Sequence, residues 1–181
     1  MIAILVAEGY ECVEAICPYN LLKRAGLDVR FVGLKGKTAG GSCGVTVDCA
    51  MTAAELIESG EKLDMLVLPG GLPGATNLDE APETDKLIEI TEKCGGFFAA
   101  ICAAPMVYGK RGMLKGKKAT AFPEFRKYLE GAEIPEANVV RDGRFITAAG
   151  MGAAFDFGLE LITAMKDRKT ADKVSSAVCA K

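Results

Sequence analysis

Short apolar runs alternate along the chain with segments in which apolar residues recur every three or four positions. The runs have the length of buried strands, and the spaced segments are typical of amphipathic helices. The predicted strands cover residues 2–6, 28–34, 45–48, 64–68, 97–101, 118–120, 139–141 and 144–147. The predicted helices cover residues 13–25, 52–59, 84–93, 104–111, 124–129, 153–165 and 171–178. This alternation predicts an α/β protein.

Local signals set several of these boundaries. Gly26 is typical of the residue that ends a helix, and the sequence Thr52-Ala-Ala-Glu55 is a capping box that begins one. Asp142-Gly143 between two apolar runs predicts a hairpin with a type I′ turn.

The strands are almost continuously apolar, which is typical of a mostly parallel sheet covered by helices on both faces. The chain shows no repeat, linker or low-complexity stretch, so we expect one doubly wound domain over residues 1–181. In such sheets, ligands bind beyond the carboxyl ends of the strands, near a switch in strand order.

Composition and charge exclude several classes of partner. Half of the residues are apolar and the net charge is −2, so no basic excess favours nucleic acid or an anionic membrane. No apolar run reaches the ~18 residues of a membrane span. The first residues read as a strand and not as a signal peptide. We therefore expect a cytoplasmic protein with no membrane or direct nucleic-acid partner.

The chain has seven cysteines and no histidine. The absence of histidine excludes Ser-His-Asp and Cys-His machinery and histidine metal ligands, so proton transfer falls to a carboxylate, Lys, Tyr or Cys. No C-x-x-C pair is present, which argues against a zinc knuckle or a thioredoxin-type pair. We expect no metal and no cofactor, and free thiols in a reducing compartment.

The candidate chemistry lies after two predicted strands. Cys102 follows the strand at 97–101 on a tight turn into a helix, where backbone N–H groups favour a thiolate. Gly70 and Gly71 follow the strand at 64–68, and their N–H groups can hold a developing oxyanion. The alternatives are that Cys102 is a buried small hydrophobe and that Pro69-Gly70-Gly71 is only a turn.

Three acids, Glu8, Glu11 and Glu14, cluster after the first strand. They are either a solvated helix N-terminus or the source of one carboxyl group that reaches the Cys102 thiol.

In this order and spacing, these motifs resemble the ThiJ/PfpI superfamily, which includes the parkinsonism-associated deglycase, and most of all its YajL-like bacterial branch. The resemblance covers essentially the whole chain. It is carried by Glu11-x-x-Glu14, Leu22-Lys23-Arg24-Ala25-Gly26, Val67-Leu68-Pro69-Gly70-Gly71, Ala99-Ala100-Ile101-Cys102-Ala103-Ala104-Pro105, Thr120-Ala121-Phe122-Pro123, Gly150-Met151-Gly152 and Phe155-Asp156-Phe157-Gly158.

The resemblance implies a flavodoxin-like fold and a homodimer. It makes Cys102 the nucleophile on a strained elbow and Glu14 the carboxyl group in contact with its sulfur. It also implies that Gly70, Gly71 and Ala103 are the donors that line a small pocket, to which we add Phe122 and Gly150 as pocket residues.

Two departures from the family pattern change these expectations. Phe122 stands where the family often carries a histidine, which leaves a more apolar wall and no imidazole. Many relatives have Cys-Ser-Arg in the loop after the second strand, where this chain reads Gly41-Ser42-Cys43-Gly44-Val45. Cys43 is then either a second redox-active thiol or an inert loop residue, and the remaining cysteines read as packing or surface residues.

Two functions are compatible with these residues. In the first, Cys102 attacks small reactive aldehydes, as in a glyoxalase or deglycase, with Glu14 moving the proton. In the second, Cys102 is oxidised to a sulfinate in a redox sensor or chaperone, without turnover. Because two anions in one pocket repel, we expect a thiolate of lowered pKa beside a protonated Glu14. A structural dimer is a third possibility, and the missing histidine argues against a protease or amidotransferase.

Overall fold

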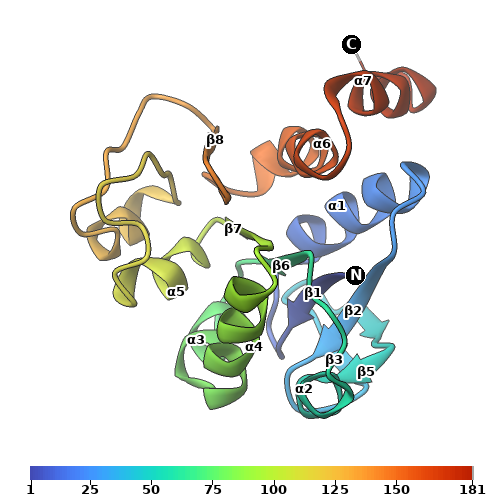
Figure 1. The fold of residues 1–181 in the computed structure, drawn as a ribbon, viewed down its shortest axis with the longest axis vertical. Helices are drawn as coiled ribbons and strands as arrows, with labels where there is room; N and C mark the ends of the chain where they lie inside the picture. The colour runs from blue at the N-terminus through green and yellow to red at the C-terminus, as the bar shows by residue number, and fades with distance from the viewer. Residues whose placement is uncertain (181) are drawn as a thin grey trace.

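A seven-stranded sheet forms the centre of the protein in a computed structural model that describes residues 1–180 (Figure 1). Its order is β5-β2-β1-β6-β7-β9-β8, and every neighbouring pair is parallel except β8 and β9. The strands are β1 (Ile2–Val6), β2 (Val29–Gly33), β5 (Met51–Thr52), β6 (Met65–Leu68), β7 (Phe97–Ile101), β8 (Val139–Asp142) and β9 (Phe145–Ala148). The predicted α/β class is confirmed.

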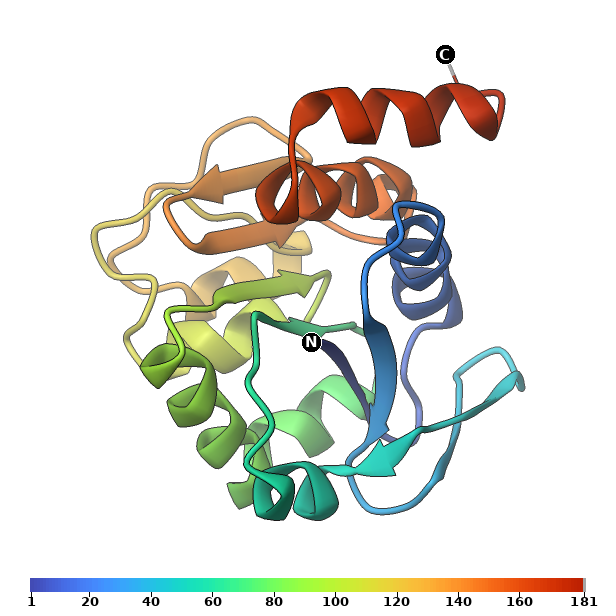
Figure 2. The same cartoon turned by 45° about the vertical axis from the view of Figure 1, so that its right-hand side comes forward.

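Helices cover both faces of the sheet, as the two views in Figures 1 and 2 show. One face carries α2 (Ala53–Ser59), α3 (Gly74–Glu80), α4 (Pro82–Lys93) and α5 (Pro105–Lys110). The other carries α1 (Cys12–Arg24) and α6 (Ala154–Met165), with α7 (Arg168–Ala177) packed against α6. A sheet buried on both sides explains why its strands are almost continuously apolar.

Alternate residues of each strand enter two separate cores. In β1, Ala3 and Leu5 belong to the core under α2 to α5, whereas Ile2, Ile4 and Val6 belong to the core under α1 and α6. This division follows from the two-residue period of a strand, and it gives each helical layer its own apolar support.

The order of the strands places their carboxyl ends around one point. The chain runs from β1 outward to β2 and then returns to β6 on the other side of β1, so the order reverses between β1 and β6. The loops that follow β1, β6 and β7 leave the sheet beside this reversal, where doubly wound sheets bind ligands.

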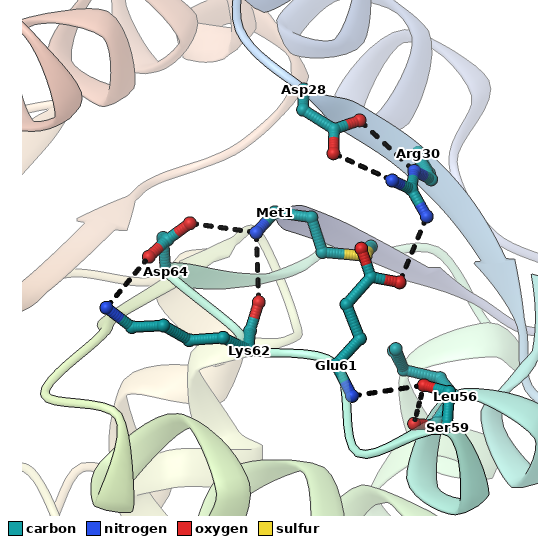
Figure 3. Close-up of polar contacts among 8 residues, drawn as sticks. All are labelled: Met1, Asp28, Arg30, Leu56, Ser59, Glu61, Lys62 and Asp64. Atoms are coloured by element: carbon teal, nitrogen blue, oxygen red, sulfur yellow. Dashed lines mark hydrogen bonds and ion pairs between the residues drawn. The ribbon is translucent and has the colours of Figure 1, made fainter.

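Polar contacts hold the amino ends of β1, β2 and β6 together, as Figure 3 shows in close-up. The Met1 ammonium donates to Asp64 at 2.8 Å, next to the start of β6. Arg30 in β2 bridges Asp28 at 2.8 Å and Glu61 at 3.0 Å. Partly exposed pairs of this kind contribute at most ~1 kcal/mol each, so they fix the ends of the strands more than they stabilise the fold.

Most predicted elements are present, and the differences have local causes. A hairpin of β3 (Thr38–Gly40) and β4 (Thr46–Asp48) forms a separate two-stranded sheet; of these strands only the second was predicted. The apolar pattern does not predict β3, β5 or α3. The two strands have at most three residues each, and α3 begins at Gly74 without a side-chain cap, so neither type carries a periodic signal.

Three predictions in the second half of the chain need correction. Residues 118–120 are not a strand, because Lys118 makes only an isolated bridge to Glu133. The helix expected at 124–129 is the 3₁₀ helix η1 (Pro123–Tyr128). The type I′ turn is also wrong: Asp142 still pairs with Phe145, which leaves Gly143-Arg144 as the turn, and only the glycine has a positive φ, at 58°.

Over the part of the chain that the structure describes, no helix is both long and apolar enough to cross a membrane.

The largest aromatic cluster gives a test of the core. Phe98 in β7 is 1% exposed, and its ring lies 5.5 Å from that of Tyr108 and 5.2 Å from that of Phe145. Phe98→Ala removes these contacts and is expected to lower the free energy of unfolding by about 3–5 kcal/mol in urea titrations. Val45→Ala, at a position 45% exposed, should stay within about 0.5 kcal/mol of wild type. Equal effects of the two substitutions would contradict this packing.

Candidate active site

Cys102 lies on a strained turn between β7 and α5. Its φ is 63°, in the left-handed region that non-glycine residues rarely adopt, and the turn is fixed on both sides. The Cys102 N–H donates to the Ala148 carbonyl at 2.9 Å, and the Cys102 carbonyl accepts from the Phe122 N–H at 2.9 Å. The side chain is partly exposed, so the sulfur is both held in place and open to a small reagent.

Glu14 is the carboxyl group beside this sulfur. It lies in the first turn of α1, is 1% exposed, and accepts from the Gly70 N–H through Oε2 at 3.0 Å. The Cys102 thiol lies next to the same carboxyl group. The other oxygen, Oε1, is buried and accepts no hydrogen bond. An unpaired buried carboxylate oxygen is costly, which favours a proton shared between Glu14 and the sulfur.

Gly70 makes this close approach possible. A Cβ atom at Gly70 would lie 2.5 Å from Glu14 Oε2 and 2.7 Å from Cys102 Cβ. Any side chain there would push the two groups apart, so the glycine after β6 is a steric requirement of the site.

Burial controls the proton affinity of the pair. It raises the pKa of Glu14 to about 7, against the opposing hydrogen bonds from Cys102 and Gly70. Burial and the neighbouring Glu14 carboxylate raise the pKa of Cys102 to about 12, against donation from the Ala103 and Gly71 N–H groups. The expected lowering of the thiol pKa is therefore wrong: withdrawal from water and the like charge of Glu14 outweigh the backbone donors.

The predicted backbone N–H donors are shared between the Cys102 sulfur and the Glu14 carboxyl group. The N–H groups of Gly71 and Ala103 face the Cys102 sulfur, whereas that of Gly70 is taken by Glu14. Because α5 has only six residues, stabilisation of negative charge on the Cys102 sulfur rests on these individual N–H groups and not on the helix as a whole.

Gly150 lies beside the sulfur, and the Phe122 ring lies beside Gly150. A Cβ atom on Gly150 would lie 4.0 Å from Cys102 Sγ and 3.5 Å from the Phe122 ring. Phe122 is 41% exposed and presents an apolar wall without a proton donor. The structure thus brings every predicted pocket residue close to Cys102, whereas Cys43, predicted as a second redox thiol or an inert loop residue, lies elsewhere.

The other two acids of the first loop, Glu8 and Glu11, accept hydrogen bonds away from the thiol. Glu8 accepts from the Gly40 N–H at 2.9 Å. Glu11 caps α1 by accepting from the Val13 N–H at 3.4 Å, and it also accepts from the Ser42 hydroxyl at 2.9 Å. Of the three candidates, only Glu14 reaches the thiol.

Cys43 is bonded to Cys12 in a disulfide, with Cα atoms 6.5 Å apart. The expectation of seven free thiols, with Cys12 only a packing residue, is therefore wrong. No local pattern signals this pairing, because the two residues are 31 positions apart and meet only when the β3–β4 hairpin folds onto the start of α1.

Among residues 1–180, no three His, Cys, Asp or Glu side chains are grouped so that they could hold a metal ion.

The space around Gly70 predicts a matched pair of substitutions. Gly70→Ala places a methyl group against Glu14 and Cys102 and is expected to lower the free energy of unfolding by about 1–3 kcal/mol. Gly152→Ala adds the same group where nothing lies within 4 Å, so a change within about 0.5 kcal/mol is expected. Thermal unfolding of both variants measures this, and a Gly70→Ala protein as stable as Gly152→Ala would contradict the close approach.

The raised pKa of Glu14 predicts a pH-dependent stability. Because the folded state favours protonated Glu14, its contribution is complete below its ordinary pKa of 4.5 and is lost as the pH rises to about 7. The loss amounts to at most about 3 kcal/mol. Glu14→Gln cannot titrate, so urea unfolding from pH 4.5 to 8 should show a smaller fall than in wild type. Parallel curves for the two proteins would refute the assignment.

The chain is similar to known proteins along its whole length. The family model described as DJ-1/PfpI family matches residues 1–164. The chain is 32% identical over 177 residues to Protein dj-1beta of Drosophila melanogaster, covering 97% of this chain and 94% of that protein. The crystal structure of Drosophila DJ-1beta superimposes with a TM-score of 0.92 over 99% of this chain and 97% of that one, at 31% identity. This likeness confirms the predicted flavodoxin-like fold.

Two further relatives have names that describe an activity. The chain is 28% identical over 177 residues to the glutathione-independent glyoxalase DJR-1.2 of Caenorhabditis elegans, covering 97% of this chain and 94% of that protein. It is 30% identical over 171 residues to a deglycase of Pyrococcus abyssi, covering 91% of this chain and 99% of that protein. With the family model matched over residues 1–164, the chain belongs to the DJ-1/PfpI family.

Proposed function

We propose that this protein is a cofactor-independent enzyme that acts on small reactive carbonyl compounds such as methylglyoxal, through Cys102 and Glu14. The observation that carries the proposal is a partly exposed thiol on a strained turn whose only acid–base partner is a buried carboxyl group of pKa about 7. Similarity to proteins named as a glyoxalase and a deglycase supports the substrate class. Membership of the YajL-like branch stays a prediction.

The first step uses Glu14 as a general base. Above pH 7 the pair holds one proton between the carboxyl group and the sulfur, because burial and mutual repulsion raise the pKa of both groups. As the sulfur attacks the aldehyde carbon, Glu14 accepts the thiol proton and passes it to the carbonyl oxygen, giving a hemithioacetal. The Gly71 and Ala103 N–H groups stabilise the sulfur while it carries negative charge.

The second step isomerises the bound carbonyl compound. Glu14 removes the hydrogen on the carbon bonded to sulfur and returns a proton to the neighbouring carbon, which converts the hemithioacetal into a thioester. Water then cleaves the thioester, giving lactate and the free thiol. Removal of the same group from an adduct with an amine or thiol is deglycation, with that amine or thiol as the leaving group.

The missing histidine limits the chemistry to good electrophiles. Amide hydrolysis needs protonation of a poor leaving group, and the site offers only one carboxyl group for every proton transfer. The apolar Phe122 beside the sulfur adds no donor. The site therefore favours aldehydes over peptide bonds.

A second candidate function rests on the free oxygen of Glu14. The buried Oε1 has no hydrogen-bond partner, so a protonated Glu14 can donate from it to an oxygen added to the Cys102 sulfur. Peroxide would then convert Cys102 to a sulfinate held by that hydrogen bond, and the protein would report oxidative stress or act as a chaperone.

We propose that the chain pairs with a second copy of itself to form a homodimer. A groove of about 520 Å³ along α1 and α6 is lined by apolar side chains that include Val13, Ile16 and Phe155. Val13 is 43% exposed, which is unusual for an apolar residue on a helix that covers a sheet. Cytoplasmic location stays a prediction.

Methylglyoxal consumption tests the enzyme proposal. Cys102→Ala is expected to abolish turnover, and Glu14→Gln to lower kcat/KM by about 10²–10⁴, because it removes the general base. Wild-type activity should rise with pH through about 7 as Glu14 ionises. Lactate production followed at several pH values measures all three effects.

The control is Cys94→Ser, at the opposite edge of the sheet before β7, which should keep wild-type turnover. Full activity in Cys102→Ala or Glu14→Gln would refute the proposal. An inactive wild type whose Cys102 gains two oxygens on treatment with peroxide, seen by mass spectrometry, would favour the redox function instead.

A further inference from the structure

The Cys12–Cys43 disulfide is built from two unlike cysteines. Cys12 is the first residue of α1 and is 5% exposed, whereas Cys43 lies in the turn between β3 and β4 and is exposed. Exchange with a dissolved thiol requires access to one sulfur along the bond. Cys43 is the more exposed of the two residues, whereas Cys12 only borders the groove along α1, so attack is favoured at Cys43.

The leaving group is also defined by this asymmetry. When Cys43 is attacked, Cys12 leaves as a thiolate at the N-terminus of a helix of 13 residues, where the helix dipole favours an anion and the adjacent Glu11 carboxylate opposes it. A better leaving thiolate accelerates exchange. The geometry therefore favours opening of the bond from the Cys43 side.

The disulfide joins the hairpin turn to the segment that carries Glu14. The Ser42 N–H donates to the Tyr10 carbonyl at 2.8 Å, and the Ser42 hydroxyl donates to Glu11 at 2.9 Å. The Glu11 N–H in turn donates to the Gly70 carbonyl at 2.9 Å. Gly70 holds Glu14 through its own N–H. A continuous set of contacts thus runs from Cys43 to the Glu14–Cys102 pair.

We propose that Cys12 and Cys43 form a second redox site, at which low-molecular-weight thiols and disulfides exchange through Cys43 and thereby control how firmly residues 8–14 are held beside Cys102. The disulfide fastens the 41–45 turn onto the start of α1. Reduction leaves that turn attached by hydrogen bonds alone, so residues 8–14 become more mobile. The proposal goes beyond carbonyl turnover and stands without it.

The exchange balances with a thiol as the only co-reactant. A thiolate attacks the Cys43 sulfur, forms a mixed disulfide there and releases Cys12 as a thiolate. A second thiolate attacks the sulfur of the small molecule in that mixed disulfide, giving the small-molecule disulfide and the free Cys43 thiolate. Two small thiols are oxidised for each protein disulfide reduced, and the reverse sequence restores the bond.

The first experiment follows the bond itself in glutathione buffers of varied ratio. Acid quenching, alkylation with N-ethylmaleimide and peptide mass spectrometry are expected to find a linked Cys12–Cys43 peptide in oxidising buffer and two free thiols in reducing buffer. At intermediate ratios the glutathione adduct should occur at Cys43 and not at Cys12. Free thiols at every ratio, an adduct mainly at Cys12, or a link between two chains on a non-reducing gel would each overturn the proposal.

The second experiment measures the coupling to the site. Hydrogen exchange of residues 8–14 and 40–46 is expected to be at least threefold faster in Cys43→Ser than in oxidised wild type, and alkylation of Cys102 by iodoacetamide should change by at least twofold. Cys43 is exposed, so its substitution leaves the core unchanged. Cys94→Ser, at the end of α4 and outside the disulfide, is the matched control and should behave as wild type.

Unchanged exchange in residues 8–14 and unchanged Cys102 alkylation in Cys43→Ser would refute the coupling. Because neither measurement uses a carbonyl substrate, failure of methylglyoxal turnover leaves this result interpretable on its own.

Discussion

The close approach of the Gly70 backbone to a buried carboxyl group is the interaction on which the site depends. The Gly70 N–H binds Glu14 Oε2, and the absent side chain of Gly70 leaves room for both Glu14 and Cys102. Three loops, after β1, β6 and β7, meet at this glycine, because the strand order reverses beside it. The parallel sheet thus brings the three loops together, and the absence of a Cβ atom at Gly70 allows Glu14 and Cys102 to lie in contact.

Withdrawal from water then decides where the proton lies. It raises the pKa of both Glu14 and Cys102, and their mutual repulsion keeps them from ionising together. The pair therefore carries a single proton and a single negative charge near neutral pH. A carboxyl group that titrates near neutral pH beside a buried thiol suits reversible addition to aldehydes, and no imidazole is needed.

A disulfide lies close to the site, between the β3–β4 hairpin and the start of α1. The β3–β4 hairpin lies outside the main sheet and touches the body of the protein through the loop that follows β1. The disulfide between Cys12 and Cys43 adds a bond at this seam, and hydrogen bonds connect the seam to the Glu14 carboxyl group. Under the proposed exchange, the surrounding thiols and disulfides would set the redox state of Cys12 and Cys43. That state would change the mobility of residues 8–14 beside the Cys102 thiol.

The sequence by itself predicted most of the elements, the fold class and the ends of the strands where the candidate site lies. Near-continuous apolar strands are typical of a covered parallel sheet, and residues that follow its strands gather at one edge, which was enough to single out Cys102 and Gly70. The choice of Glu14 among the three acids came from the family resemblance and from no local pattern. Tertiary structure decided what depends on distance between remote residues: how burial shifts the pKa of Glu14 upward, and which cysteines pair. Desolvation and disulfide formation are properties of the assembled chain, and no local pattern of residues records them.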